Sequence, residues 1–389
     1  MQDYRPLRGI KILDLSALLP GPYCTMLLAS LGAQVLKVES PQGGDSMRRM
    51  SPKTFEYLNA QKDLISLDLK NPRGRELFLD LAATCDVLLE GFRPGVAARL
   101  GVDFDPVSQA NPSIIYCSLS GYGQDGPYAS WPGHDLNYMG IAGVLSISGN
   151  PNSGRPEFPS GPQYSDLAGS LFAANAILAA LLGRASDPGA RFLDVSMSES
   201  TGMLVMPRYM EFLHRGNPPK EVFMARGPYG VFQARDGKYL TLGIVEDHFW
   251  QNFCRAAGLD ELAEDPELQG WLARNQQAAR LIPLLEQVFQ GKDREEWLRL
   301  LSDADVPVAP VHDLDQWTSD PQLIERGFFG PKQEESGTEV FPRFPVPGMG
   351  RRGSGEIQGL AVGRDTGKWL QERGLTSKEI DSLREQMII

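Results

Sequence analysis

The sequence predicts an α/β fold, with a large domain built on a doubly wound, Rossmann-like parallel sheet and a smaller α+β domain after it. Three observations support this prediction. Short apolar segments alternate with helical patterns as far as residue 119. A tight-hairpin dipeptide, Asp236-Gly237, lies between two strand patterns in the later part of the chain. The chain has 389 residues, which is long enough for two or three domains with their own cores.

Strand and helix patterns alternate in the first half of the chain. Apolar runs typical of strands occupy residues 10–15, 35–38, 64–69, 87–89, 114–119 and 192–195. Helical patterns occupy residues 22–31, 73–83, 165–182 and 199–213. Because this is the order of repeated βαβ units, we expect a parallel sheet. Pro- and Gly-rich loops interrupt the pattern at residues 121–133 and 149–162.

The organisation changes after residue 227. Strand patterns at residues 231–235 and 238–243 flank the Asp-Gly dipeptide, and helical patterns follow at residues 247–257, 276–290, 294–303 and 376–386. We expect four segments: a large domain over residues 1–200, a linker helix over 201–226, a small α+β domain over 227–318, and a return segment over 319–389 that packs on the large domain.

Composition argues against several classes of partner. With 38 Lys+Arg against 49 Asp+Glu, the net charge is −11 and no basic stripe is present, so we expect no nucleic acid partner. The four cysteines lack metal-binding or disulfide spacing, so we expect no metal site and a reducing, cytoplasmic setting. The longest apolar stretch, residues 167–183, is short for a membrane span and contains Ser170 and Asn175. We therefore expect a buried helix and no membrane partner.

Residues 121–126 match the GxGxxG pattern of a dinucleotide-binding turn. In such a turn a helix starts at once, so that its N-terminus faces the pyrophosphate. Pro127, Pro132 and Gly133 exclude a helix at this point. We interpret the segment as a Gly-rich loop, which is either structural or covers a ligand.

Four polar side chains are candidates for chemistry. Arg93 follows a predicted strand at the ligand-binding edge of an α/β sheet, where it could clamp a phosphate or lie on the surface. His134 lies in a predicted loop that could expose it to a substrate. Asp166 lies at the start of a predicted helix. It could cap that helix, or it could act as a base or nucleophile beside free backbone N–H groups. Glu246 ends a predicted strand, where it could orient a histidine or cap the next helix.

Together these segments resemble the family III CoA-transferase superfamily of the CaiB/BaiF type, which includes the 2-methylacyl-CoA racemases. The resemblance covers nearly the whole chain through residues 7–14, 21–22, 31–33, 37–39, 67–70, 92–95, 119–123, 194–197, 236–239 and 363–366. It implies an acyl-CoA thioester as substrate, no separate cofactor, and an interlocked homodimer of ring-like chains.

The resemblance also implies roles for three of the candidates. Asp166 is the shared acid, which forms an aspartyl-CoA anhydride in transferases and is one of two bases in racemases. Residues 133–138 resemble the racemase segment that supplies the catalytic histidine, here His134, and Glu246 would pair with it. Residues 167–170 look more like a transferase, and Lys37 stands where many racemases have an arginine.

We therefore expect a racemase that inverts the α-carbon of 2-methyl-branched acyl-CoA by two-base proton transfer. The alternatives are CoA transfer between carboxylic acids through Asp166, and acyl-CoA binding without catalysis. The expected CoA-binding residues are Arg93, Lys37, Lys62, Gly121 and Tyr122. Backbone N–H groups beside Asp166 are expected to polarise the thioester oxygen. The stripe of Met203, Met206 and Met210 is either core or a pliable acyl pocket.

Overall fold

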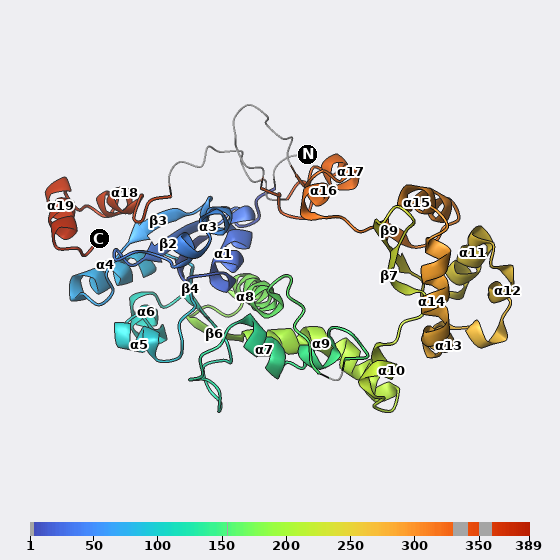
Figure 1. Cartoon of the computed structure of the whole chain (residues 1–389). Helices are drawn as coiled ribbons and strands as arrows, with labels where there is room; N and C mark the ends of the chain where they lie inside the picture. The colour runs from blue at the N-terminus through green and yellow to red at the C-terminus, as the bar shows by residue number, and fades with distance from the viewer. Residues whose placement is uncertain (1–3, 154, 330–340, 350–359) are drawn as a thin grey trace. The chain divides into compact units, whose positions relative to one another are not determined.

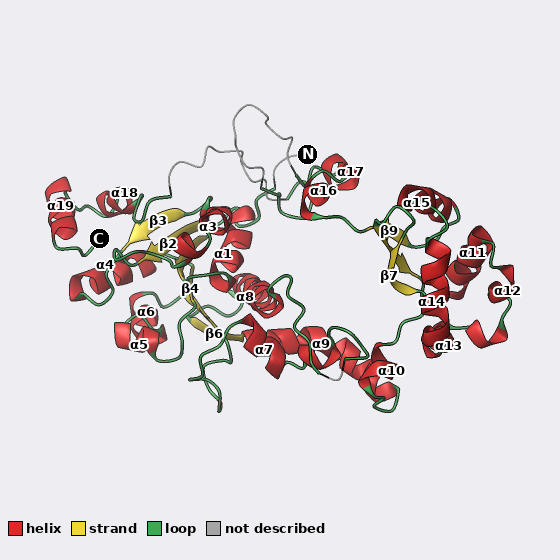
Figure 2. Ribbon diagram, viewed as in Figure 1, coloured by secondary structure: helices red, strands yellow, loops and turns green. Residues whose placement is uncertain are grey.

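Six parallel strands form a sheet in the order β3-β2-β1-β4-β5-β6. Strands β2, β3, β4 and β6 of this sheet are labelled in Figure 2. The strands are β1 Lys11–Leu15, β2 Gln34–Glu39, β3 Asp63–Ser66, β4 Val87–Glu90, β5 Ile115–Ser120 and β6 Arg191–Ser196. The predicted parallel sheet is confirmed. The strand order reverses between β1 and β4, and open α/β sheets bind ligands beyond the carboxyl ends of strands at such a point.

Helices cover both faces of this sheet and create two apolar layers. On one face, α1 (Pro20–Ser30) and α8 (Tyr164–Gly183) pack over alternate strand residues such as Ile12 and Leu89. On the other face, α4 (Pro72–Ala82) packs over the intervening residues, such as Leu88. Burial on both faces explains why the strands read as apolar runs in the sequence.

Shorter helices complete the unit that contains the sheet. They are α2 Met47–Met50, α3 Pro52–Asn59, α5 Val96–Leu100, α6 Phe104–Ala110, α7 Asp135–Ile141, α17 Pro321–Glu325, α18 Thr366–Gln371 and α19 Ser377–Glu385. The short helix η1, Val144–Ile147, spans the boundary with the smaller unit. The last residues of the chain pack at the β3 edge: the Leu64 N–H donates to Asp365 Oδ2 at 2.8 Å, and the Ser66 N–H donates to Thr366 Oγ1 at 2.9 Å.

A separate, smaller unit contains an antiparallel sheet of three strands, in the order β7-β8-β9. Its strands are β7 Tyr229–Gln233, β8 Tyr239–Gly243 and β9 Val308–Pro310, and the predicted hairpin joins the first two. Its helical elements are α10 Lys220–Met224, α11 Asp247–Ala257, α12 Asp260–Ala263, η2 Pro266–Leu268, α13 Trp271–Gln276, α14 Ala278–Phe289, α15 Arg294–Asp303 and α16 Leu314–Thr318. Trp250, Phe253 and Phe289 are fully buried in its core.

The computed structural model describes residues 4–153, 155–329, 341–349 and 360–389 (Figure 1). By its contacts, the chain divides into a large unit of residues 1–145, 158–208 and 321–389 and a small unit of residues 146–157 and 209–320. The division falls within the long helix α9, Met197–His214. Residues 341–349 and 360–389 belong to the large unit.

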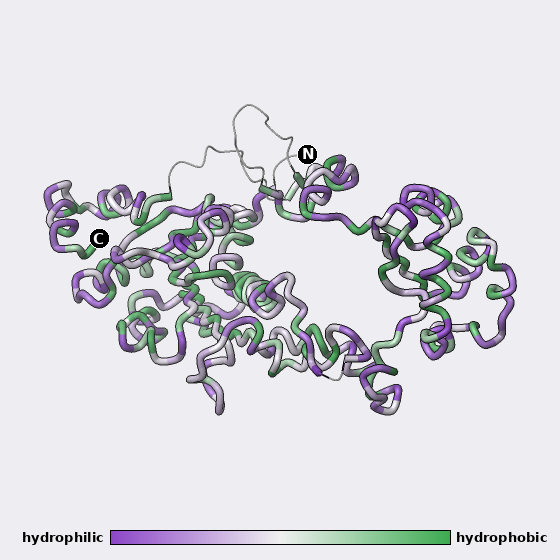
Figure 3. The backbone as a smooth tube through the Cα atoms, in the orientation of Figure 1, coloured by the Kyte–Doolittle hydropathy of each residue, from purple (hydrophilic) through white to green (hydrophobic). Residues whose placement is uncertain are grey.

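One described helix, α8, has the length and composition of a membrane span, and a core helix of a soluble protein can pass the same test (Figure 3). It packs against α1, β5 and β6. Its buried residues include Ala173 and Ile177, whereas Leu171 and Leu182 are exposed. On α9, Met203, Met206 and Met210 are also exposed, at 59%, 42% and 48%. The methionine stripe is therefore not part of the core of this chain, which overturns that interpretation.

Candidate functional site

The first turn of α8 is capped by a carboxylate from another helix. Asp135, the first residue of α7, is buried, and its Oδ1 accepts the backbone N–H groups of Ser165 at 2.6 Å and Asp166 at 3.2 Å. The side chain of Gln163, at the N-cap position of α8, makes no capping hydrogen bond. The first N–H groups of a helix have no partners within the helix, and Asp135 accepts two of them. The negative charge of Asp135 also interacts favourably with the positive N-terminal end of the helix dipole.

This cap changes one expectation about the start of α8. The N–H groups of Ser165 and Asp166 donate to Asp135, and the N–H of Leu167 donates to the Gln163 carbonyl oxygen at 3.0 Å. These groups are already occupied, so the expectation that N–H groups beside Asp166 polarise a thioester oxygen is wrong.

His134 lies next to the same capping carboxylate. It is the last residue of the predicted loop, in extended conformation at the N-cap position of α7, directly before Asp135. The loop prediction for His134 is confirmed, but the sequence does not predict the helix that follows it. Pro132 and Gly133 obscure this short helix in the sequence because they directly precede it. The backbone N–H of His134 donates to Asn137 Oδ1 at 3.0 Å, and its imidazole is exposed. Asp135 thus brings the backbone at His134 close to Asp166.

The carboxyl group of Asp166 is half-buried, and its pKa is raised above the ordinary value. Burial raises the pKa of Asp166 to about 7, and the negative charge of Asp135 adds to this shift. An acid with a pKa near neutrality can both accept and donate a proton under the same conditions. Strongly shifted values of this kind are common at catalytic sites.

Tyr138, on α7, packs between two glycine-containing loops. Its hydroxyl donates to the Gly133 carbonyl oxygen at 2.6 Å, and its ring meets that of Tyr122 edge to face at 5.1 Å. A Cβ atom on Gly121 or Gly133 would lie 2.4 or 2.6 Å from Tyr138 Cε1, so both positions require glycine. The interpretation of the GxGxxG segment as a loop is confirmed, and the structure adds that this loop packs on a tyrosine. Gly121 and Tyr122 are thereby brought to the start of α7.

Arg93 lies in the loop that follows β4, at the switch point of the sheet. Its side chain is exposed, and among the described residues none forms an ion pair with it. Burial raises the pKa of Tyr138 to about 12, Asp166 adds to that shift, and the charge of Arg93 opposes it. Arg93 and Asp166 thus act on the same phenol with opposite sign.

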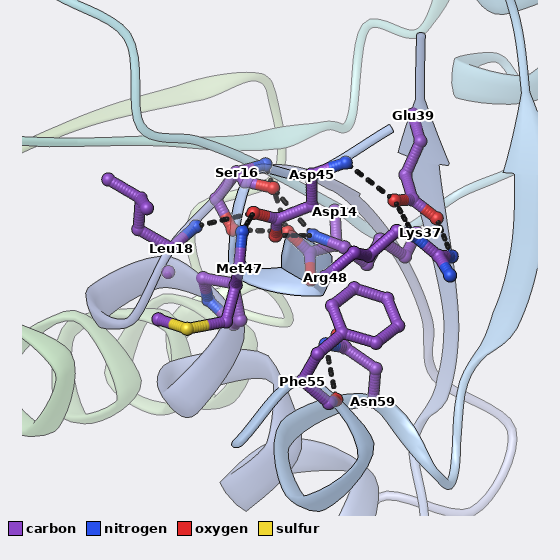
Figure 4. Close-up of polar contacts among 12 residues, drawn as sticks. Asp14, Ser16, Leu18, Lys37, Glu39, Asp45, Met47, Arg48, Phe55 and Asn59 are labelled. Atoms are coloured by element: carbon purple, nitrogen blue, oxygen red, sulfur yellow. Dashed lines mark hydrogen bonds and ion pairs between the residues drawn. The ribbon is translucent and has the colours of Figure 1, made fainter. Parts of the chain in front are cut away.

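Lys37 and Lys62, which were expected to hold CoA phosphates, are buried in the large unit. Lys37 Nζ lies 3.0 Å from Asp45 Oδ2 and donates to the Ser16 carbonyl oxygen at 2.7 Å (Figure 4). Lys62 Nζ lies 3.0 Å from Asp14 Oδ2. The two lysines are only 0% and 2% exposed. Since both amines are buried and paired, neither is available to a phosphate, and the expectation is corrected.

Asp14 is the central acid of this buried ionic cluster. The hydroxyls of Ser16 and Thr25 donate to it at 2.5 and 2.6 Å. Burial acts to raise its pKa, but the charges of Lys62 and Lys37 and the two hydrogen bonds hold it well below its usual range. Burial also lowers the pKa of Lys62 to about 8, against the attraction of Asp14. The cluster thus joins β1, β2 and α1.

The same cluster extends to the turn that follows β2. Glu39 Oε1 accepts the Asp45 N–H and Arg48 Nε, each at 2.8 Å. The Arg48 guanidinium also lies 3.9 Å from the centre of the Phe55 ring. Lys37, Lys62 and Arg48 therefore stabilise the fold through buried or partly buried ion pairs.

Glu246 belongs to the small unit, where it precedes α11 at the N-cap position. Its side chain is exposed. The residues on either side are held by Arg274, which is completely buried: Nη2 donates to the Val245 carbonyl oxygen at 2.6 Å, and Nη1 donates to Asp247 Oδ1. The backbone at Glu246 is therefore fixed, with the carboxylate turned to solvent.

Sequence reasoning missed Asp135 and Arg274 as supports of the candidate residues. Asp135 lies within the racemase-like segment next to His134, and this adjacency was a usable signal. Arg274 is far from Glu246 in the sequence and offers none. In the described part of the chain, no group of three or more His, Cys, Asp or Glu side chains is arranged to hold a metal ion.

Comparison with known proteins decides the family. The pattern of CoA-transferase family III matches residues 7–358. The chain belongs to CoA-transferase family III. This confirms the resemblance inferred from the motifs, and an acyl-CoA substrate is consistent with the family.

Relatives in this family carry two kinds of activity in their names. Alpha-methylacyl-CoA racemase of Homo sapiens is 31% identical over 394 residues, covering 98% of this chain and 97% of its own. Succinyl-CoA:glutarate CoA-transferase of Homo sapiens is 32% identical over 337 residues, covering 84% and 76%. The solved structure of a CaiB/BaiF family protein from Brucella suis has a TM-score of 0.79 and 28% identity, covering 94% of this chain and 99% of its own. Similar identities to racemase and transferase do not choose between the activities.

The buried ionic cluster gives a prediction about stability. Asp14→Ala should lower the free energy of unfolding by about 3–5 kcal/mol, because it leaves Lys62 buried without its charged partner. Glu76→Ala, which removes an exposed ion pair with Arg73, is the matched control and should cost at most about 1 kcal/mol. Denaturant unfolding measures both values. Equal, small losses for the two variants would contradict the role given to the cluster.

The pKa of Asp166 gives a prediction about pH. Between about pH 4 and 7, folded wild-type protein retains the Asp166 proton that the unfolded chain releases, so its stability falls as the pH rises. Asp166→Asn removes this titration, so the stability of the variant relative to wild type should increase from pH 4 to pH 7. Denaturant midpoints measured across this range, with the exposed Asp80→Asn as control, test this. A pH-independent difference between Asp166→Asn and wild type would disprove the shift.

Proposed function

We propose that this protein is a racemase of 2-methyl-branched acyl-CoA thioesters that inverts the α-carbon by 1,1-proton transfer. One observation carries the proposal: the Asp135 carboxylate follows His134 directly and accepts the N–H of Asp166. This capping contact brings together the backbone of two residues whose side chains are suited to proton transfer. Inversion requires an acid and a base on opposite faces of the reacting carbon, and this pair can supply both.

In the proposed reaction the two groups exchange roles with the configuration of the substrate. For one enantiomer, unprotonated His134 takes the α-proton, the electrons form an enolate with the thioester carbonyl, and protonated Asp166 delivers a proton to the opposite face. For the other enantiomer, Asp166 is the base and His134 is the acid. The pKa of Asp166, raised to about 7, supports this exchange because both of its protonation states are populated near neutral pH.

Binding of CoA is assigned to the loops at the carboxyl edge of the sheet. The chain carries a net charge of −11, so a phosphate-rich substrate has to be held by local cations. Lys37 and Lys62 are buried and paired, whereas Arg93 is exposed at the switch point. We therefore propose Arg93 as a phosphate contact, with the loop of Gly121 and Tyr122 beside it.

A second copy of the chain is part of the proposal. Large apolar side chains are exposed on α8 and α9: Leu182 at 84%, Met203 at 59% and Leu204 at 58%. Exposed apolar clusters are typical of surfaces that another protein covers. We propose an interlocked homodimer in which the partner's Glu246 orients His134 and stabilises its charged form. The four free, buried cysteines accord with a cytoplasmic setting.

CoA transfer between carboxylic acids is the second candidate. Here the Asp166 carboxylate attacks the thioester carbonyl carbon and the CoA thiolate leaves, which forms a mixed anhydride of Asp166 and the donor acyl group. The CoA thiolate then attacks the Asp166 carbonyl carbon and releases the donor carboxylate, which leaves CoA as a thioester on Asp166. The acceptor carboxylate displaces CoA from this thioester, and CoA attacks the acceptor carbonyl of the second anhydride, which forms the new acyl-CoA and frees Asp166. Residues 167–170, which look like those of a transferase, and the similarity to the human succinyl-CoA:glutarate CoA-transferase support this candidate.

Isotope incorporation separates the two candidates. The protein is incubated with (2R)-2-methylacyl-CoA in deuterated water, and separately with an unlabelled acyl-CoA and an isotope-labelled acceptor acid. A racemase should place deuterium at the α-carbon and lose stereochemical purity at the same rate. Label that enters the thioester without deuterium exchange would overturn the racemase proposal and favour transfer.

His134→Ala supplies the control for this experiment. Racemisation should fall by about 100-fold or more, because removal of a general acid or base commonly costs 10²–10⁴-fold. Transfer through Asp166 does not need the imidazole and should continue. Asp166→Asn should abolish either activity, so a variant that retains full activity would disprove both assignments.

A further inference from the structure

Three polar side chains form one row across the carboxyl edge of the large sheet. Glu90 on β4 pairs in register with Ser118 on β5, and Ser118 pairs with Asp194 on β6. Register partners on neighbouring strands project to the same face, so the three side chains lie side by side. Glu90 and Ser118 are buried, at 3% and 0% exposure, and Asp194 is exposed. The two buried polar side chains need partners, and two loops supply contacts to the row.

The first loop is the one that carries Arg93. Glu90 Oε2 accepts the backbone N–H of Phe92 at 2.7 Å, and Ser118 is the register partner of Glu90 on β5. On the other side of the loop, the Val96 N–H donates to the Arg93 carbonyl oxygen at 3.1 Å. The backbone is therefore fixed immediately before and after Arg93, while its guanidinium remains exposed.

The second loop carries Gly121 and Tyr122. Gln124 Nε2 donates to Ser118 Oγ at 2.8 Å, and the Gln124 N–H donates to Asp194 Oδ2 at 3.0 Å. One glutamine thus attaches this loop to two members of the row. Both loops that the proposed function assigns to CoA are held by the same three residues of neighbouring strands.

The chemistry of Glu90 suits a structural acceptor. Burial raises the pKa of Glu90 to about 7, whereas Ser118 and the Phe92 N–H oppose that shift and Asp194 adds to it. A neutral carboxyl group resembles a glutamine amide in size, and both can accept one N–H and donate one hydrogen. Replacement by glutamine therefore retains the contact to Phe92, whereas replacement by alanine removes it.

We propose that the row of Glu90, Ser118 and Asp194 positions the Arg93 and Tyr122 loops to bind the phosphate-bearing part of CoA. The inference rests on the proposed function only in assigning these loops to CoA, and it holds for racemase and transferase alike. Glu90 is a positioning residue, because it acts through the backbone of Phe92. Its loss should therefore affect CoA binding far more than the chemical step.

The test measures affinity for free CoA by calorimetry, together with KM and kcat for the acyl-CoA substrate. Glu90→Ala should weaken CoA binding and raise KM about tenfold, with kcat changed less than about twofold, as expected when only binding is lost. Glu90→Gln should stay within about threefold of wild type in all three quantities. Gln124→Ala frees the second loop without emptying a buried site, and it should weaken CoA binding several-fold.

Two further variants make the outcome decisive. Arg93→Ala should weaken CoA binding by at least tenfold, and the exposed Glu76→Ala should leave it unchanged. If Arg93→Ala weakens binding while folded Glu90→Ala and Gln124→Ala do not, the inference is wrong and the phosphate contact stands. If Arg93→Ala has no effect, the phosphate contact is wrong and the inference fails with it. If Glu90→Ala does not fold, Gln124→Ala decides the matter by the same measurement.

Discussion

The Asp135 carboxylate is the contact on which the candidate site depends. It fixes the start of α8, adds to the raised pKa of Asp166, and directly follows His134 in the chain. Without it, the buried first turn of α8 would lose the acceptor of two N–H groups, at a cost of about 1–3 kcal/mol each. Both of the proposed reactions assign a role to Asp166, so this contact would serve either one.

The charged residues of the large unit divide into two groups with different roles. One group forms ion pairs that connect β1, β2 and the turn after β2, and it consists of Lys37, Lys62 and Arg48. Arg93 is left exposed at the edge where ligands bind, and its backbone is held by the Glu90 row. Because the net charge of the chain is −11, recognition of an anionic substrate then depends on where individual cationic side chains lie, and not on the electrostatic field of the whole protein.

The sequence predicts much of the fold, because apolar periodicity reports directly on burial. The parallel sheet, the hairpin at Asp236-Gly237, and helices α11 and α15 follow from local patterns. The pairing of Lys62 with Asp14 does not, because it joins residues distant in the chain whose contact depends on strand order. Helix α7 was hidden by the prolines and glycine before it. The methionines of α9 match a core pattern, yet they are exposed, since apolar spacing alone does not tell which surface covers a face.

The titration of the Asp166 carboxyl group tests the central claim most directly. Carbon-13 NMR of protein labelled at the aspartate carboxyl carbon, with Asp166→Asn to identify the signal, gives its pKa in wild type and in Asp135→Asn. We predict a pKa near 7 in wild type and a lower value in Asp135→Asn, which retains an acceptor oxygen for the cap but loses the charge. An ordinary carboxyl pKa of about 4 in wild type, or an identical value in both proteins, would contradict the account.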